Sequence, residues 1–403
     1  MSNDFNYNAN VMKEIIITLI ALLLGTTTVC GQVNNMEKVD SVSSGYFKYY
    51  VMKESVTGNT YAYVASLSGG PYVPGGIKYP AKLDIPSSIK YNNYSIQVRG
   101  IYNSAFQSCD WLEQIKLPSV MKEICDNAFA SCGKLKVIFP SSLSKVGVHA
   151  FKGTSIIDAD FSQVSFFDNY GLEGCDIENI TIGPWLNKRT DAHIGSYCFK
   201  DTYLKNLYFM EQKQRILMPV HAISYCDITE LKLPQRAYVA SEAIYRCRKL
   251  ERVIFPETDS LFFIGMQQSV SDVECCYAKT FNVISDCPVF KEIVAMNPYP
   301  LSFYWWGAKY DDILLVDDYS QCVLKVPQGS EDLYRADPVW GRFERIEGFA
   351  PGEYTGISEA PVAEVESEVT PVYYNLQGMQ VKEPVKGQLY IRRTGTKTAK
   401  IAY

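Results

Sequence analysis

The motif that decides the fold is Asn103-Ser-Ala-Phe-Gln-Ser-Cys109, which returns as Asp126-Asn-Ala-Phe-Ala-Ser-Cys132 and as Val148-His-Ala-Phe-Lys-Gly-Thr154. Weaker copies continue the series. The large apolar residue of each copy falls at Phe106, Phe129, Phe151, Leu172, Phe199, Ile223, Ile244 and Ile284. Most steps between these positions lie within the roughly 20–29 residues of a short solenoid coil, and the longer step before Ile284 marks an insertion. The pattern predicts stacked coils that share one apolar spine.

A short alternating stretch follows the motif, as in Leu112-Glu-Gln-Ile-Lys-Leu-Pro118 and Ile228-Thr-Glu-Leu-Lys-Leu-Pro234. Alternation with a period of two is typical of a half-buried strand, and the closing proline has no N–H with which to continue a ladder. One such unit cannot bury its apolar face alone, whereas stacked units form a parallel sheet along one side of a continuous core. The sequence therefore predicts a mainly β repeat solenoid.

The A-F-x-x-C motif, the L-x-x-I-x-L-P strand and the step of about 23 residues resemble the BspA-type leucine-rich repeat of bacterial surface proteins. The resemblance covers roughly residues 83–350, and it departs from the pattern at Thr154 and Thr202, where the motif has cysteine. It implies a right-handed superhelix of leucine-rich repeats. It also implies adhesion to host matrix proteins or to other cells, although such repeats bind unrelated ligands as well.

The segments before the repeats indicate export and a cap. An apolar run over residues 15–24, followed by small residues, predicts a signal peptide within residues 1–31, with Met12 as the true start. The run is too short to span a bilayer. Cleavage would place the protein outside the cell or on its outer surface, and a lipoprotein anchored through Cys30 is the less favoured alternative. Alternating Tyr and Val in residues 32–97 predict an N-terminal β cap over the first open edge.

The repeats and a closing unit occupy residues 98–350. In the closing unit, Cys322-Val-Leu-Lys-Val-Pro327 predicts a strand, and a short helix with Ser330 as its N-cap follows. Residues 351–370 are expected to form a linker. Residues 371–403 predict a C-terminal β-hairpin tail, which resembles the type IX sorting tails of secreted Bacteroidota proteins or is simply an additional hairpin.

Composition and motifs argue against nucleic acid and against catalysis. The net charge is −5 and its signs are mixed, so no basic footprint for nucleic acid exists. His149 and His221 share a motif position that elsewhere holds Ser, Asn, Tyr or Glu, as a turn position would. Asp311-Asp312 and Asp317-Asp318 lack the pattern of a calcium loop, and nucleotide fingerprints are absent. We expect no enzyme, no cofactor and no metal site.

The 12 cysteines suit an exported protein, yet six of them occupy the last position of the motif. That position requires a small buried side chain, and free cysteine behaves as a small hydrophobic residue. Neighbouring side chains in such a ladder point the same way, which favours free thiols. A disulfide from Cys275-Cys276 to another loop cysteine stays open.

The outward positions of the predicted strands form the candidate binding face. They are Gln114, Lys116, Lys136, Ile138, Asp158, Asp160, Asn179, Thr181, Asn206, Tyr208, Glu230, Lys232, Arg252 and Ile254. A flat ladder of this kind is a usual solenoid binding face, and the alternative is a merely solvated sheet. The expected partner is a protein or glycan, such as a host matrix protein, with no membrane span. A secreted hydrolase with its site in residues 257–282 and a passive envelope scaffold are the alternatives.

Overall fold

The computed structural model describes residues 36–67, 80–156, 158–161, 164–183, 192–210, 215–258, 261–264, 282–302, 304–305, 308–309, 314–354, 372–374, 380–381, 389–394 and 397–402. These belong to two compact units, Met1–Thr355 and Gly356–Tyr403. The predicted signal peptide, the pair Cys275-Cys276, the pair Asp311-Asp312 and most of the predicted linker lie outside the described residues. Among the residues that the structure describes, no helix is long and apolar enough to cross a membrane.

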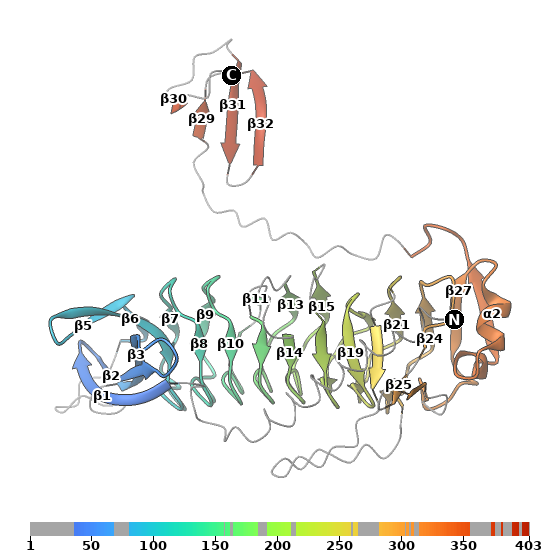
Figure 1. Ribbon diagram of the computed structural model, residues 1–403, viewed down its shortest axis with the longest axis horizontal. Coiled ribbons are helices and arrows are strands. Elements are labelled where there is room, and N and C mark those ends of the chain that lie inside the picture. The colour runs from blue at the N-terminus through green and yellow to red at the C-terminus, as the bar shows by residue number, and fades with distance from the viewer. Residues whose placement is uncertain are drawn as a thin grey trace. The chain divides into compact units, whose positions relative to one another are not determined.

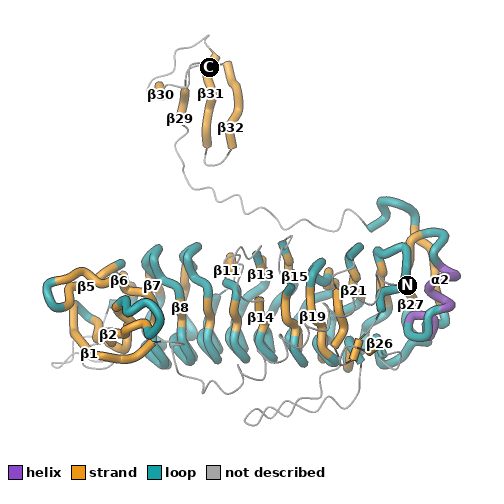
Figure 2. Tube along the Cα trace, in the orientation of Figure 1, coloured by secondary structure: helices purple, strands orange, loops and turns teal. Residues whose placement is uncertain are grey.

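The first unit is a solenoid of parallel strands, which confirms the predicted fold (Figures 1 and 2). The predicted strands form the sheets β4-β7-β9, β11-β13-β15 and β18-β21-β24-β27-β28. Their bounds are β4 Lys82–Asp84, β7 Gln114–Lys116, β9 Lys136–Ile138, β11 Asp158–Phe161, β13 Asn179–Ile182, β15 Asn206–Phe209, β18 Glu230–Lys232, β21 Arg252–Phe255, β24 Glu292–Ala295, β27 Val323–Pro327 and β28 Arg345–Phe349. We call this side of the solenoid the strand face.

A second parallel ladder, which the sequence analysis missed, runs along another side of the coils. It comprises β6 Tyr94–Ile101, β8 Glu123–Ile124, β10 Lys145–Val146, β12 Phe166–Phe167, β14 Ala192–Ile194, β16 Ile216–Met218, β19 Ala237–Ala240, β22 Leu261–Ile264 and β25 Tyr304–Trp305, which turns back as β26 Ala308–Lys309. The prediction of a sheet along one side is therefore incomplete. Several of these strands have only two residues, too few to show an alternating pattern.

The core is the predicted spine of motif residues. Phe106, Phe129, Phe151, Leu172, Phe199, Ile223 and Ile244 are 0% exposed, and Ile284 is 2% exposed. Phe106 stacks on Phe129 with ring centroids 5.1 Å apart, and Phe129 stacks on Phe151 at 5.5 Å. Every coil thus buries its motif against the next coil.

An antiparallel meander covers the first coils. It consists of β1 Met36–Ser44, β2 Phe47–Glu54 and β3 Thr60–Leu67, and β3 continues parallel to β6 into the second ladder. β5 Ser88–Tyr91 pairs antiparallel with β6. The strand face begins at β4, which lies parallel to β7 and upstream of the predicted repeat start at residue 98.

The last coils are closed by α2 Glu331–Ala336 and the 3-10 turn η1 Trp340–Arg342. Buried Tyr334 donates its hydroxyl hydrogen bond to the carbonyl oxygen of Asn297 at 2.9 Å, and Trp340 donates from Nε1 to Leu301 O at 2.9 Å. Ser330 is the N-cap as expected, but its side chain makes no capping hydrogen bond.

The second unit is an antiparallel sheet of four strands in the order β30-β29-β31-β32. Its strands are β29 Val372–Tyr374, β30 Gln380–Val381, β31 Leu389–Thr394 and β32 Lys397–Ala402. The predicted two-stranded hairpin is therefore wrong. A lone hairpin is marginally stable, and here β29 is paired along both of its edges.

Candidate functional site

The repeated motif folds into a turn with two residues in the left-handed region of backbone space. The first precedes the motif alanine, with φ between 51° and 59°, at Ser104, Asn127, His149, Tyr170, Tyr197, His221 and Glu242. The second comes four residues later, with φ between 52° and 65°, at Ser108, Ser131, Gly153, Gly174, Asp201, Tyr225, Arg246 and Asp286. Most of these are neither Gly nor Asn, the residues that adopt this conformation at least cost.

This backbone directs alternate N–H groups along the solenoid, so each turn donates hydrogen bonds to the next. In the first turn, the N–H groups of Ser104, Phe106 and Ser108 donate to carbonyl oxygens of the next coil at 2.8–2.9 Å. Later turns extend the pattern into the short parallel strands β17 Ile223–Ser224, β20 Ile244–Tyr245 and β23 Ile284–Ser285. Equivalent side chains therefore lie one above another on this side.

Aromatic side chains stack along these turns. His149 stacks on Tyr170 with ring centroids 4.8 Å apart, and Tyr170 stacks on Tyr197 at 5.1 Å. His221 lies 4.7 Å from Tyr197 and 4.3 Å from Tyr245. We call this row of rings, together with the charged residues beside it, the turn ladder. Its members are His149, Lys152, Tyr170, Glu173, Tyr197, Lys200, Asp201, His221, Tyr225, Glu242, Tyr245, Arg246 and Asp286.

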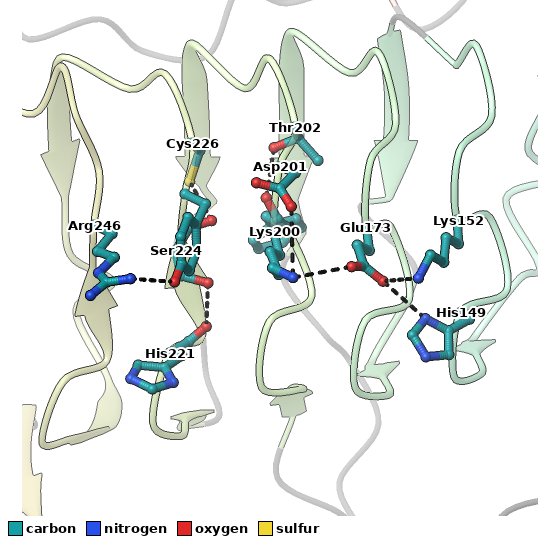
Figure 3. Close-up of polar contacts among 12 residues, drawn as sticks. His149, Lys152, Glu173, Lys200, Asp201, Thr202, His221, Ser224, Cys226 and Arg246 are labelled. Atoms are coloured by element: carbon teal, nitrogen blue, oxygen red, sulfur yellow. Dashed lines mark hydrogen bonds and ion pairs between the residues drawn. The ribbon is translucent and has the colours of Figure 1, made fainter. Parts of the chain in front are cut away.

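Glu173 is the hub of an ion-pair network at one end of the turn ladder (Figure 3). Its Oε2 lies 3.2 Å from Nδ1 of His149 and 2.9 Å from Nζ of Lys152. Its Oε1 lies 3.4 Å from Nζ of Lys200 in the following coil. Burial alone would raise the pKa of this carboxyl, but the hydrogen bonds to His149 and Lys152 and the nearby lysine charges lower it to about 2. The carboxylate thus ties three coils together.

The other end of the ladder combines a buried pair and an exposed cation. Nε2 of His221 lies 3.1 Å from Oε2 of Glu242, and their side chains are 9% and 8% exposed. Arg246 is half exposed, and its Nη1 donates to the hydroxyl of Tyr225 at 3.1 Å. Its guanidinium lies 4.9 Å from the ring centroid of Tyr245, a cation–π distance.

The polar side chains of the turn ladder contact one another. Both histidines occupy strained turn positions and are paired with carboxylates rather than with a nucleophile. In the part of the chain that the structure describes, no group of three or more His, Cys, Asp or Glu side chains could hold a metal ion. The chemistry of the turn ladder is packing, ion pairing and hydrogen bonding.

A shallow depression of about 250 Å³ lies on the second ladder and is lined by Glu123, Ser144, Lys145, Ser165 and Phe166. Its two serine hydroxyls donate to backbone carbonyl oxygens, Ser144 to Lys122 O at 3.1 Å and Ser165 to Ser144 O at 3.4 Å. A hydroxyl that donates its hydrogen to a backbone carbonyl is not donating it to a base that would activate it as a nucleophile. The depression is a surface feature of the sheet.

The residues predicted for the strand face are brought into register by strand pairing. Asn179 pairs with Asn206, Thr181 with Tyr208, and Glu230 with Arg252, while Gln114 pairs with Lys136. Exposed members are Gln114, Lys116, Lys136, Asn206 and Lys232, and half-buried members are Asn179, Thr181, Tyr208, Glu230 and Arg252. The side chains of Ile138, Asp158 and Asp160 lie outside the described residues.

Ile254 is the exception on this face. It was expected to be exposed, but it is 1% exposed, and its neighbour Val294 in β24 is fully buried. The chain that follows β28 returns to this end of the face, where Tyr354 lies 5.7 Å from the guanidinium of Arg252 and packs edge-on against Phe349. The position of Ile254 is therefore not accessible to a partner.

The charged side chains of the strand face differ in whether they form ion pairs. Arg252 is paired with Glu230 at 2.9 Å and also contacts Glu292. By contrast, Lys116, Lys136 and Lys232 are exposed and form no ion pair with any residue that the structure describes. Unpaired cations on an open sheet are available to a partner.

The sequence analysis did not identify the turn ladder as a surface. It placed His149 and His221 at a turn position, where the structure has them, but it did not connect them with Tyr170 and Tyr197. The available signal was the shared motif position itself, since residues at one position of successive coils must stack.

Comparisons with known proteins found one family model and several solved structures. Residues 85–191 and 188–269 match the family model of the BspA type leucine rich repeat region in 6 copies. A leucine-rich repeat protein from Bacteroides ovatus is 18% identical, with a TM-score of 0.39 over 74% of this chain and 86% of that chain. A leucine rich cell surface protein from Faecalibacterium prausnitzii is 15% identical, with a TM-score of 0.37 over 79% of this chain and 96% of that chain. The T. pallidum leucine rich repeat protein is 15% identical, with a TM-score of 0.29 over 66% of this chain and 86% of that one. No curated protein matches the chain.

Proposed function

Because residues 85–269 form a BspA-type leucine-rich repeat region, we propose that this protein is an exported surface protein that binds a protein partner through its strand face. The observation that carries the proposal is the presence of three exposed lysines on the strand face, Lys116 in β7, Lys136 in β9 and Lys232 in β18, none of which forms an ion pair with a described residue. Charged residues at the accessible part of a surface guide association and select the partner. The partner is expected to be an acidic matrix protein of the host.

Export is supported by the sequence of the first 31 residues, with its apolar run and small residues before Gln32. The net charge of the chain is −5, which gives no basic surface for binding nucleic acid or anionic lipid without specificity. Protease treatment of intact cells should therefore remove the protein while a cytoplasmic marker survives. Survival of both would contradict a surface location.

Binding rather than catalysis is the role we assign to the described residues. The polar groups of the turn ladder are engaged with one another, and the serines of the shallow depression donate to backbone oxygens. Purified protein should give no turnover of peptide or glycoside substrates above a buffer control. Turnover that survives purification would favour the hydrolase alternative.

The decisive experiment compares two triple charge reversals in the full chain. The face variant carries Lys116→Glu, Lys136→Glu and Lys232→Glu. The control variant carries Lys53→Glu, Lys90→Glu and Lys122→Glu, which are exposed lysines away from the strand face. Both change the net charge equally, so only position differs.

Binding is measured to a panel of immobilised matrix proteins at physiological salt. The face variant should bind at least about tenfold more weakly than the control variant, since each close charge pair contributes on the order of 1 kcal/mol or more to binding. Equal binding by the two variants would place the site elsewhere. Failure of the unmodified chain to bind any of the panel would reject a matrix partner.

A further inference from the structure

Two thiols of consecutive coils lie in contact inside the solenoid. Sγ of Cys226 is 3.8 Å from Sγ of Cys247, and the two residues are 1% and 0% exposed. Both are free in the structure, as expected from the motif. They follow the paired strands β17 and β20, whose register Ile223 to Ile244 places the coils directly side by side.

The neighbourhood of Cys175, at the same motif position, is different. The residues of the adjacent coils are Thr154 and Thr202, and the hydroxyl of Thr154 lies 3.3 Å from Sγ of Cys175. Cys175 is as fully buried as Cys247, and the thiol that interacts with it electrostatically, Cys198, stands at another motif position. Cys109 also neighbours Cys132, and Cys247 also neighbours Cys287, so the contact of Cys226 with Cys247 is one of several between motif thiols. Cys175 is the matched position with threonine neighbours in both adjacent coils.

The geometry of the pair suits a covalent link. A disulfide needs Cα atoms about 4.4–6.8 Å apart and an S–S bond of about 2.05 Å. Neighbouring parallel strands lie about 4.8 Å apart, within that Cα range. The strand spacing is therefore compatible with a disulfide, and the two sulfur atoms, 3.8 Å apart, already face each other at contact distance. We propose that Cys226 and Cys247 form a disulfide that staples consecutive coils when the chain meets a disulfide oxidant outside the cell.

The reaction is an exchange in two steps. The thiolate of one cysteine attacks a sulfur of the oxidant, forms a mixed disulfide and releases one thiol of the oxidant. The second cysteine, having lost its proton, attacks the protein sulfur of the mixed disulfide and releases the other thiol. The two cysteines lose two protons and two electrons, and the oxidant disulfide is reduced to two thiols.

Burial controls when this exchange occurs. The hydrogen bond with Cys226, together with burial, raises the pKa of the Cys247 thiol well above its usual value. The thiol therefore remains protonated and shielded in the closed solenoid, and exchange proceeds during folding or local opening of the coils. Once formed, the link fixes the coils that carry Tyr225 and Arg246, the residues directly before the two cysteines.

The test uses the full chain with Cys30, Cys275 and Cys276 replaced by Ser. The protein is refolded with oxidised and reduced glutathione, denatured, alkylated, and digested for mass spectrometry. We expect a linked peptide containing Cys226 and Cys247, and alkylated Cys175. Alkylation of both Cys226 and Cys247 after refolding, or oxidation of Cys175 to the same extent, would overturn the proposal.

Three variants keep the result interpretable. Thr154→Cys gives Cys175 a thiol neighbour and should create a second link, whereas Cys247→Ser should remove the first. Loop closure over the 21 positions between the two cysteines should raise the melting temperature of the oxidised protein by about 5–10 °C over its reduced form. Cys247→Ser should abolish that difference, whereas Cys287→Ser, which removes the other thiol beside Cys247, should leave it unchanged. A difference that persists in Cys247→Ser would show that another link is responsible.

Discussion

The strand face and the turn ladder are two sides of the same coils, and they hold the solenoid together differently. On the strand face, outward side chains such as Lys116 and Lys136 are exposed and unpaired with any described residue. On the turn ladder, side chains contact their equivalents in the next coil through rings and ion pairs. One side is open to partners, and the other is used to fix the register of the coils.

The turn ladder also explains how unusual backbone conformations are tolerated. A left-handed conformation costs a residue such as Tyr170 or Tyr197 about 1–2 kcal/mol. A favourable aromatic pair contributes about 0.5–1.5 kcal/mol beyond its burial. The stacks between coils therefore offset much of the strain. This explains why aromatic residues can occupy these left-handed positions.

The largest expected effect concerns the spine beneath the turns. Phe129→Ala removes a ring that stacks on both Phe106 and Phe151, and it should cost about 3–5 kcal/mol of stability. Ile180→Ala, in the fully buried inner row of the strand face, should cost about 2–4 kcal/mol. The two variants are compared by urea unfolding. A larger loss for Ile180→Ala would show that the turn side is not the more tightly packed of the two.

The next effect is electrostatic: the stability contributed by the turn ladder should depend on pH more strongly than that contributed by the strand face. The folded pKa of Glu173 is about 2, below its ordinary value of 4.5, so this carboxylate stabilises the fold above about pH 4.5. That contribution is lost as the pH falls from 4.5 towards 2. Because Lys152 is half exposed, we expect about 1–2 kcal/mol rather than the full shift.

Glu173→Gln should lower the urea midpoint at pH 7 and flatten its decline between pH 4.5 and pH 2.5. The matched change on the strand face is Glu230→Gln, whose ion pair with Arg252 is about one-third exposed on each side. It should cost less than about 1 kcal/mol. Equal losses from the two variants would remove the electrostatic distinction between the sides.

Much of the fold could be predicted because it depends on local patterns. Alternation in stretches such as Gln114–Lys116 marks the strand face, and the recurring Phe106 position marks the spine. The second ladder could not be predicted in this way, since Glu123–Ile124 and Lys145–Val146 are too short to alternate. Their pairing depends on the length of each coil, which the motif turns and the strand face determine.

The candidate surfaces show the same limit. The outward positions of the strands follow from their period, but Ile254 is buried beside Val294 of the next strand, a pairing 40 positions away that alternation within one strand does not reveal. Similarly, Tyr, His and Glu at the turns carry no local signal of a left-handed backbone, unlike Gly153 and Gly174. These conformations become predictable only when the stacking of side chains between successive coils is known.

The smallest effect tests the backbone alone. Gly153 has φ of +65°, and no atom lies within 4 Å of the place where a Cβ would stand. Gly153→Ala should therefore destabilise by about 1 kcal/mol through conformational strain and not through a clash. Ser131 occupies the same position one coil earlier, with φ of 61°, so Ser131→Gly should stabilise by a few tenths of a kcal/mol, about what relief of strain leaves after the added chain entropy.

A substitution to glycine on the strand face should change stability in the opposite direction. Lys116→Gly lies in β7, an extended backbone without strain, and should cost about 0.5–1 kcal/mol because glycine loses more entropy on folding. Urea midpoints for Ser131→Gly and Lys116→Gly in one background measure this contrast directly. If both substitutions destabilise equally, the left-handed turns store no strain and the stacked rings are not offsetting any. Opposite signs would mean that the aromatic row is maintained at a backbone cost that the open face does not carry.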